Sequence, residues 1–341
     1  MQESLRVALA ADEPEHVCRA YVNLIQCEVE RLRLDIAGRY VDQAIAFAER
    51  VEFMMFAAYL QCSQGQLRLA IADFDGALSS VRPALDGAPP VRCAALILAG
   101  RARSRRGEAA APEMLREAWR VAVPLRERQR IAAAAAALAE AAALGRDTGV
   151  AADELIEVYE LTRDCGKPAE RADLGYWLGR AGHRVTPPEV DHPYALLAAG
   201  RWREAAETWR AAGCPYEHAL AQADSPDPAD RLAALALLDT LGAEPLARLV
   251  RAGLRRAGVT RIPRGPVPAT RLNPAGLTER QAEVLRLLAE GLTNAQIADR
   301  LVVSVRTVGS HVAAVLHKLH SRTRRQAVAR AVELGILSAD G

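Results

Sequence analysis

Aromatic residues are scarce in this sequence, and so are the signals of β-strands. Only 4% of the 341 residues are Phe, Trp or Tyr, although half of the residues are hydrophobic. The apolar content is therefore mostly Ala, Leu and Val, which is typical of packed helices and not of β-sandwiches. We predict an all-α protein, and a chain of this length has room for two or three domains.

Motifs of catalysis and of nucleotide binding are also absent. No G-x-x-x-x-G-K-[ST] sequence occurs, because Gly166-Lys167 is followed by Pro168, so the chain has no P-loop of its own. The nucleophile motif GxSxG, the zinc motif HExxH and the dinucleotide fingerprint GxGxxG are missing as well. We therefore predict that the protein is not an enzyme and binds no cofactor.

The cysteines form no metal motif and the chain has no long apolar run. Six cysteines stand far apart, none in a CxxC pair and none followed by His at zinc-finger spacing: Cys18, Cys27, Cys62, Cys93, Cys165 and Cys214. We expect reduced thiols and no metal site. The N-terminal segment is acidic and interrupted by a proline, unlike a signal peptide. These features predict a cytoplasmic protein with no membrane partner.

The sequence is most informative in residues 277–337. Thr-x-x-Gln sequences begin at Thr278, Thr293 and Thr323, each next to an apolar run. In such a capping box the hydroxyl accepts the backbone N–H three residues on, and the Gln side chain bonds back to the first residue. Ser304 is a fourth candidate for an N-cap. These signals predict four short helices.

Apolar residues at helical spacing predict how these helices pack. The expected stripes are Val284, Leu285 and Leu288; Ile297, Ala298 and Leu301; and Val305, Val308, Val312, Val315, Leu316 and Leu319. An apolar turn at Val302-Val303 separates the second stripe from the third. A short helix, a tight turn and a longer helix make the helix-turn-helix pattern, whose second helix lies in a DNA major groove.

Residues 277–337 resemble the LuxR-type helix-turn-helix domain of bacterial transcription regulators. The resemblance rests on LTERQAEVL, GLTNAQIA, S-V-R-T-V-x-x-H-V with K-L, and RTRRQAVARA. It implies a transcriptional regulator that binds double-stranded DNA and reads promoter sequences through a recognition helix over 304–319. The family dimerises through its fourth helix, which implies a homodimer through Ala327, Val328, Ala331 and Leu334. The other interpretation is that these four residues close the small domain.

The candidate DNA contacts lie at helix starts and on the polar side of the third helix. A helix N-terminus offers free N–H groups and a partial positive charge to a phosphate. The residues placed for phosphate contacts are Thr293, Asn294, Ser304 and Thr307, with His311 and Lys318 further along. The outward positions of the third helix are Arg306, Thr307, Gly309, Ser310, Ala313, His317 and Lys318. The resemblance places the base contacts at Gly309, Ser310 and Ala313.

Gly309 departs from the family, which commonly has a Lys at this position. The three base-reading residues offer one hydroxyl and methyl contacts to thymine, but no bidentate fork to guanine. We therefore predict modest intrinsic specificity, supplemented by Arg306, by DNA shape and by pairing of two half-sites. The alternative is that Gly309 is a neutral change.

An arginine-rich segment precedes the helix-turn-helix. Residues 245–273 contain no Asp or Glu but several arginines: Arg248, Arg251, Arg255, Arg256, Arg261, Arg264 and Arg271. Such an arm either follows the DNA backbone or is a soluble tether. A second cluster, Arg322, Arg324 and Arg325, opposes the dipole at the start of the fourth helix. It indicates either an anionic partner or a solvated turn.

The first 258 residues are helix-compatible almost throughout. Glycines at expected breaks, Gly38, Gly65, Gly107 and Gly200, precede an aromatic or apolar residue and then Ala, which resembles half of a tetratricopeptide-type hairpin. We predict a tetratricopeptide-like α-solenoid that takes a small-molecule or protein effector on its concave side. We expect Trp177, Trp202 and Trp209 to be wedges between helices.

The predicted organisation has three parts: a helical sensor or interaction domain over 1–258, an Arg/Pro-rich linker over 259–276 and the helix-turn-helix domain over 277–341. The helical region also resembles the C-terminal half of large ATP-binding LuxR-type regulators, without their ATPase module. The competing hypothesis is a helical protein–protein interaction scaffold with a weak or vestigial DNA-binding module.

Overall fold

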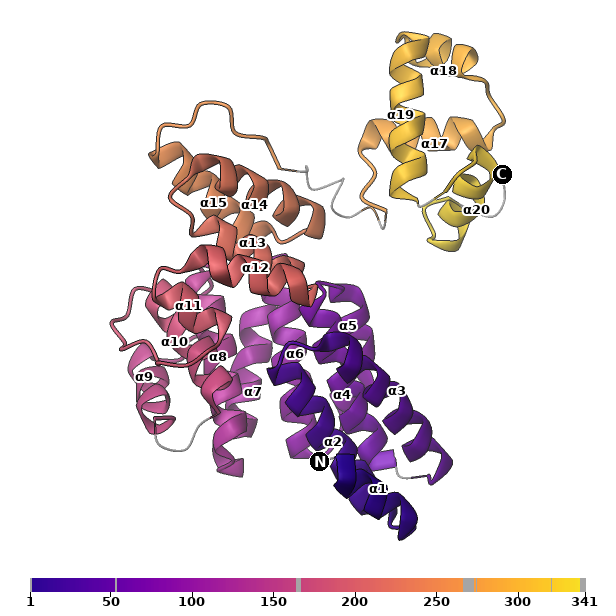
Figure 1. Ribbon diagram of the computed structural model, residues 1–341. Coiled ribbons are helices and arrows are strands. Elements are labelled where there is room, and N and C mark those ends of the chain that lie inside the picture. Colours follow the sequence, from indigo (N-terminus) through magenta and orange to yellow (C-terminus); the bar gives the residue numbers. More distant parts are fainter. Residues whose placement is uncertain are drawn as a thin grey trace. The chain divides into compact units, whose positions relative to one another are not determined.

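The structure is a computed structural model that describes residues 2–52, 54–163, 167–265, 273, 275–319 and 321–337. All regular structure in these ranges is helical, with no strand, as the composition predicts. The chain divides into two compact units, Met1–Pro263 and Arg264–Gly341 (Figure 1). The finer boundaries at 258 and 276 stay a prediction. Residues 266–272 and 274 of the expected linker lie outside the described residues.

The first unit is a stack of helices joined by short turns. Its helices are α1 (Gln2–Ala10), α2 (Pro14–Glu30), α3 (Leu34–Arg50), α4 (Met54–Ala70), α5 (Phe74–Val81), the 3-10 turn η1 (Arg82–Ala84), α6 (Pro89–Arg106), α7 (Ala111–Leu125), α8 (Arg128–Ala143), α9 (Ala152–Leu161), α10 (Pro168–Arg180), α11 (Pro193–Ala198), α12 (Trp202–Ala212), α13 (Pro215–Ala223), α14 (Pro228–Leu241) and α15 (Glu244–Arg256). Consecutive helices pack together, and α2, α4, α6, α8 and α10 also pack in series as an inner layer. This arrangement is compatible with stacked helical hairpins.

Four turns near the N-terminus recur at equal spacing. Asp12, Leu32, Glu52 and Ala72 have left-handed φ angles of 55°, 56°, 55° and 59°, so the turns follow one another at intervals of 20 residues. None of these residues is a glycine, although the left-handed region costs other residues about 1–2 kcal/mol. The backbone therefore repeats at these turns, but no glycine in the sequence indicates where they lie.

The expected breaks at Gly38 and Gly65 are wrong, because both residues lie inside helices, in α3 and α4. Gly107 does end a helix, as the left-handed C-cap of α6, and Gly200 lies in the turn between α11 and α12. A Cβ on Gly65 would lie 2.5 Å from Val81 Cγ1. Gly65 thus allows α4 and α5 to approach closely, and it does not form a turn.

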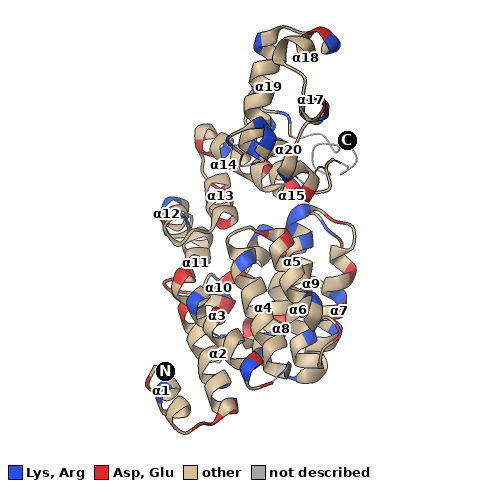
Figure 2. Ribbon diagram, turned by 90° about the vertical axis from the view of Figure 1, so that its right-hand side faces the viewer, with Lys and Arg blue, Asp and Glu red and all other residues tan. Residues whose placement is uncertain are grey.

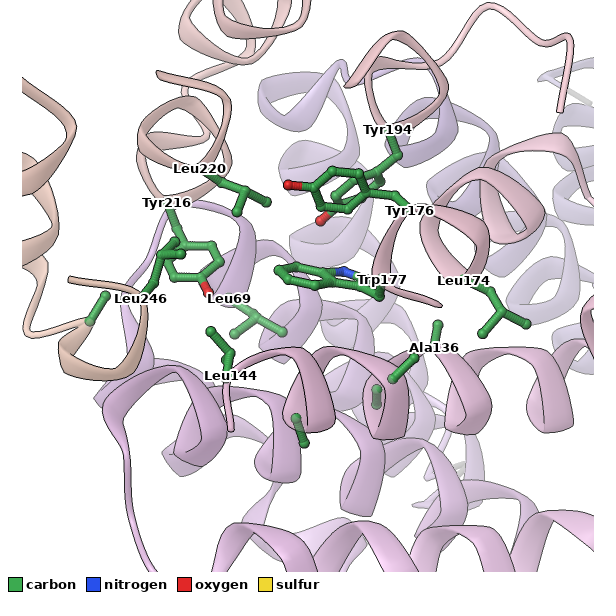
Figure 3. Close-up of a cluster of buried hydrophobic side chains, with 14 of the residues drawn as sticks. Leu69, Ala136, Leu144, Leu174, Tyr176, Trp177, Tyr194, Tyr216, Leu220 and Leu246 are labelled. Carbon is green, nitrogen blue, oxygen red and sulfur yellow. The ribbon is translucent and has the colours of Figure 1, made fainter. Parts of the chain in front are cut away.

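The core of the first unit contains a row of aromatic rings. Trp177 and Trp209 are 0% and 2% exposed, which confirms that they are core residues. The ring centroids of Trp177 and Tyr176 are 5.1 Å apart, and those of Tyr194 and Trp209 are 4.9 Å apart. Figure 3 shows Trp177 between these tyrosines and the leucines of neighbouring helices. Trp202 is only partly buried at the edge of this core.

A buried ion network joins four helices of the first unit. Arg105 Nε donates to Glu140 Oε1 at 2.7 Å, and its Nη1 lies 2.9 Å from Glu217 Oε1. Arg101 Nη2 donates to Asp173 Oδ2 at 2.6 Å, and its Nε lies 3.3 Å from Glu140 Oε2. Burial would lower the pKa of both guanidiniums, but the carboxylates raise it above its usual value. Both arginines are therefore charged and tie α6 to α8, α10 and α13.

Five cysteines lie in the described residues and all are free thiols: Cys18, Cys27, Cys62, Cys93 and Cys214. Cys165 lies outside them. Burial raises the pKa of the Cys62 and Cys214 thiols to about 12, so neither forms a reactive thiolate near neutral pH. Among the described helices, none is long and apolar enough to cross a membrane. Nor do any three metal-binding side chains converge in the described ranges.

In its described residues the second unit contains four helices, in the order that the capping signals predict. They are α17 (Glu279–Ala289), α18 (Asn294–Leu301), α19 (Val305–Lys318) and α20 (Arg324–Glu333). Helix α19 packs against each of the other three. It is therefore the central element of this unit.

The left-handed turns lead to a stability prediction. Replacing exposed Glu52 with Gly should raise the free energy of unfolding by up to about 1 kcal/mol, because a left-handed penalty of about 1–2 kcal/mol is removed and the flexibility of Gly offsets part of the gain. Urea denaturation of the full chain measures the change. The matched control is Asp42→Gly, because Asp42 is exposed in the middle of α3. This variant should lower the free energy of unfolding by about 1 kcal/mol, the cost of a Gly inside a helix. Equal losses in both variants would contradict the assignment of the turn.

Candidate nucleic-acid interface

The helices of the second unit begin at the predicted capping residues. Thr278 and Thr293 form complete capping boxes with Gln281 and Gln296. Ser304 Oγ accepts the backbone N–H of Thr307 at 3.1 Å. These bonds fix where α17, α18 and α19 start, and so which N–H groups remain free at each start.

The third expected box is incomplete. Thr323 Oγ1 accepts the backbone N–H of Gln326 at 3.2 Å, but Gln326 Oε1 accepts the backbone N–H of Arg322 and not that of Thr323. Helix α20 therefore begins after the predicted cap residue, Thr323, but only one hydrogen bond of the capping box is formed. The side chain of Gln326 instead binds the turn that precedes the helix.

The apolar side of α19 serves two small cores. Val308 and Val312 belong to one core with residues of α17 and α18, whereas Val315 and Leu319 belong to a second core with residues of α20. Val305 was expected in this stripe, but it is the first residue of the helix and is 52% exposed. The opposite side of α19 is left to solvent.

The turn between α18 and α19 holds an unusual residue. Val302 has φ 52° and ψ 52° as the C-cap of α18, and its side chain is 90% exposed. A β-branched residue in the left-handed region is a genuine outlier. The sequence predicted an apolar turn at Val302-Val303, but only Val303 packs against the core.

Most predicted DNA contacts lie on the solvent-facing side of α18 and α19. Seven of them are exposed: Thr293, Ser304, Arg306, Thr307, Ser310, Ala313 and His317. Asn294, Gly309, His311 and Lys318 are half-buried. Helix α19 contains no Asp or Glu, and Figure 2 shows no acidic residue along its ribbon. The outward side of α19 therefore presents only neutral or basic groups to a polyanion, whereas α18 has one exposed acidic residue, Asp299.

Asn294 connects three parts of this face. Its Oδ1 accepts from Arg324 Nη2 at 2.9 Å, and a Cβ added to Gly309 would lie 4.0 Å from its Nδ2. Arg324 comes from the start of α20, 30 positions further along the chain. The sequence marked Arg324 only as one of three arginines that oppose the helix dipole, since nothing in the spacing shows that α20 begins beside α18.

The hydroxyls at the start of α19 are partly engaged within the helix. Ser304 Oγ and Thr307 Oγ1 lie 2.8 Å apart. Ser310 Oγ donates to the carbonyl of Arg306 at 3.2 Å, which leaves its lone pairs facing outward. Ser310 in this rotamer can accept a hydrogen bond from a base edge, whereas donation requires the hydroxyl to rotate.

Lys318 differs from the other predicted contacts. Its Nζ donates to the carbonyl of Gly276 at 2.6 Å and to Gln281 Oε1 at 2.8 Å, and burial lowers the pKa of its ammonium. Gln281 is itself part of the capping box of α17. The ammonium thus ties the last turn of α19 to the first turn of α17. We therefore infer a structural role for Lys318 in place of the expected phosphate contact.

The residues expected to form a dimer contact face the core of their own domain. Ala327 and Ala331 are both 0% exposed, which supports the alternative that they close the small domain. Val328 and Leu334 are partly buried against the same cores. The exposed large apolar residue of this helix is Val332, at 37%, and the smaller Ala329 is exposed as well. A dimer through α20 stays a prediction, and its contact would involve Val332 and not the two buried alanines.

The first unit contains a separate cleft. Its cavity volume is about 670 Å³, and its walls come from α2, α4, α6, α8 and α10. A second cavity of about 230 Å³ shares Gln66, Arg101 and Asp173 with the first and extends to α12 and α13. Together they form one depression along the inner layer of helices. Its total size is in the range of small-molecule sites.

Comparisons with known proteins agree with the geometry of the second unit. Residues 275–331 match the family described as "Bacterial regulatory proteins, luxR family". The chain is 47% identical over 60 residues to the DNA-binding transcriptional activator DevR/DosR of Mycobacterium tuberculosis, which covers 18% of this chain and 28% of that protein. It is 39% identical over 61 residues to the response regulator protein VraR of Staphylococcus aureus, which covers 18% and 29%.

A third relative, the uncharacterized transcriptional regulatory protein YxjL of Bacillus subtilis, is 45% identical over 60 residues, again 18% of this chain and 28% of the relative. The chain thus spans less than a third of the length of these relatives. No solved structure matches the chain. The likeness concerns the second unit and leaves the first unit without a counterpart among these proteins.

The bonds of Lys318 lead to a prediction that separates two roles. Lys318→Ala should lower the stability of the second unit by about 1 kcal/mol, since two acceptors lose their donor. The slope of DNA affinity against salt should stay unchanged. Thermal unfolding and fluorescence anisotropy at several salt concentrations measure the two effects. A slope reduced by about 1 with unchanged stability would instead indicate a phosphate contact.

The space beside Gly309 leads to a second prediction. Gly309→Lys should strengthen binding to any DNA severalfold and steepen the salt slope by about 1, because it adds a cation to the face of α19. The matched control is Gly309→Ala, which should stabilise the helix by roughly 1 kcal/mol without changing the slope. If both variants bound DNA with the same affinity and salt slope, this part of α19 would not face the duplex.

Proposed function

We propose that this chain, whose residues 275–331 form a DNA-binding domain of the luxR family, is a transcription regulator that reads promoter DNA through α19. The observation that carries the proposal is the solvent-facing side of α19, which has no acidic residue and is flanked by two capped helix starts. A helix of this kind fits a major groove, while N–H groups and hydroxyls at helix starts suit phosphates.

The proposed contacts divide into two sets. Arg306, Gly309, Ser310 and Ala313 would face base edges, with His317 beyond them. The phosphate contacts would come from Thr293, Asn294, Ser304, Thr307 and His311, together with Arg324. Contacts of the second set orient the protein without reading sequence. Because the base-facing side chains are small, paired half-sites would supply part of the specificity, which supports a homodimer on DNA.

The remaining elements of the proposal concern the whole chain. We place the protein in the cytoplasm, where bacterial promoter DNA lies, and we assign it no enzymatic activity. The first unit would regulate DNA binding in response to an effector, and the cleft along its inner layer supports that role. The competing hypothesis of an interaction scaffold is favoured by the small side chains at Gly309 and Ala313, which offer a duplex few contacts.

Arg306 provides the test of this proposal. The full chain should retain random genomic DNA fragments at low salt, and Arg306→Ala should weaken that binding severalfold and reduce the salt slope by about 1. Fluorescence anisotropy over a salt series measures both. Arg201→Ala is the control, because it removes an exposed arginine paired with Glu204 in the first unit.

Absence of retention at low salt would favour the scaffold. If the chain binds, selection of bound sequences from a random pool would identify the half-site and the spacing between two half-sites. A symmetric pair at a fixed spacing is the expected result for a homodimer.

A further inference from the structure

The base of the cleft in the first unit holds more carboxyl groups than guanidiniums. Two guanidiniums, those of Arg101 and Arg105, face the three carboxylates of Glu140, Asp173 and Glu217 at 2.6–3.3 Å. All five groups are on the inner helices or on α13. The network thus holds one carboxyl group more than it has arginines, and burial raises the pKa of Glu217.

Three carboxylate oxygens of the network have no hydrogen-bond partner within the described part of the chain. One is Glu140 Oε2, which lies 3.3 Å from Arg101 Nε. The other two, Asp173 Oδ1 and Glu217 Oε2, belong to residues of the cavity wall. In each of these two residues the other oxygen contacts an arginine, at 2.6 Å for Asp173 and 2.9 Å for Glu217. Glu217 is 8% exposed, and both residues line the smaller cavity. An unsatisfied buried carboxylate oxygen is costly, and a donor placed in the cavity would remove that cost.

A further carboxyl group lies beside them. Glu170 lines both cavities, one turn before Asp173 on α10. The pKa of Glu170 is raised to about 7, mainly by burial and to a smaller extent by Glu30 and Asp173, while Lys167 opposes the rise. Because Lys167 already pairs with Glu30, it does not neutralise Glu170. A cation in the cleft would stabilise the ionised form of this group.

The rim of the cleft adds neutral hydrogen-bonding groups. Asn23, Gln26, Gln66 and Gln129 contribute amides, and Tyr59 contributes an aromatic ring. The arginines and the lysine of the lining already have carboxylate partners, so they are not available to an incoming anion. Arg101 and Arg105 pair within the base, Arg130 pairs with Glu127, and Lys167 pairs with Glu30. A ligand with donors at one end and a polar body therefore fits this lining, whereas a carboxylate or phosphate would meet like charge.

We propose that the cleft binds a small cationic molecule that carries a primary amine or a guanidinium, with Asp173 Oδ1 and Glu217 Oε2 as its acceptors. This inference rests on the proposed role of the first unit as the part that receives an effector. The ligand adds a positive charge to a network that has fewer arginines than carboxyl groups, and it joins α10 to α13 across the depression. It thereby stabilises one arrangement of the inner helices.

Isothermal titration calorimetry on the full chain tests the proposal with a matched panel of probes. Putrescine and argininamide are the cations, succinate is an anion of similar length and glucose is an uncharged polar probe. We expect one or both cations to bind and to raise the melting temperature of the first unit, while succinate and glucose do not. Binding of succinate or glucose but not of the cations overturns the proposal, and so does the absence of binding by all four.

Isosteric variants locate the site. Glu217→Gln and Asp173→Asn should each weaken the binding of the cation at least about tenfold, the loss of one charge-assisted hydrogen bond. If either variant does not fold, Glu170→Gln provides the measurement at the cleft wall, with a loss of about threefold or more expected from the removed charge. The control Glu113→Gln changes an exposed carboxylate of α7 outside both cavities and should have no effect.

Affinities that are equal in all these variants and the wild type would place the amine elsewhere and overturn the proposal. DNA retention, measured on the same preparations, gives an independent readout. A chain that binds amines but not DNA would refute the proposed function and leave the cleft assignment standing, whereas the reverse result would refute only the cleft.

Discussion

The inward packing of Val308, Val312 and Val315 determines how α19 faces its surroundings. These side chains place α19 across two small cores, one shared with α17 and α18 and the other with α20. Since a helix turns by about 100° per residue, fixing these positions inward directs Arg306, Ser310 and Ala313 outward. The capacity to meet DNA thus follows from apolar packing. Lys318 stabilises the same arrangement by tying the end of α19 to the start of α17.

The first unit depends on a different constraint, which is the burial of charge. Arg101 and Arg105 hold α6 against α8, α10 and α13 through ion pairs with carboxylates. Removing one partner of a buried ion pair lowers the free energy of unfolding far more than the intact pair raises it relative to an apolar core. An arrangement of this kind is sensitive to any added charge. A cationic ligand would therefore act on the element that joins the helices, which is a physical route from a small molecule to the arrangement of the whole unit.

The parts of this structure that sequence could predict are those governed by local patterns. The starts of α17, α18 and α19 follow from Thr278, Thr293 and Ser304, because a capping bond depends on residues three positions apart. The all-helical class follows from composition. The left-handed turns at Leu32 and Glu52 were not predictable, since neither residue favours that conformation and the helices on both sides impose it.

Long-range placement was beyond sequence reasoning for the candidate sites as well. The contact of Arg324 with Asn294 spans 30 positions, and the network around Arg105 joins residues up to 112 positions apart. Such contacts depend on how the helices pack, and they produce no recognisable pattern of residues in the sequence. The interpretation of Lys318 changed for the same reason, because Gly276 and Gln281 are its neighbours only in the folded domain.

The most direct measurement of the central claim is a nuclear magnetic resonance titration of the isotope-labelled chain with a short DNA duplex at low salt. The account predicts that backbone amide signals shift most at the starts of α18 and α19 and along Arg306, Ser310 and Ala313, with smaller changes around the buried valines. Shifts confined to the first unit or to the arginine-rich segment before residue 273, with α19 unaffected, would contradict it.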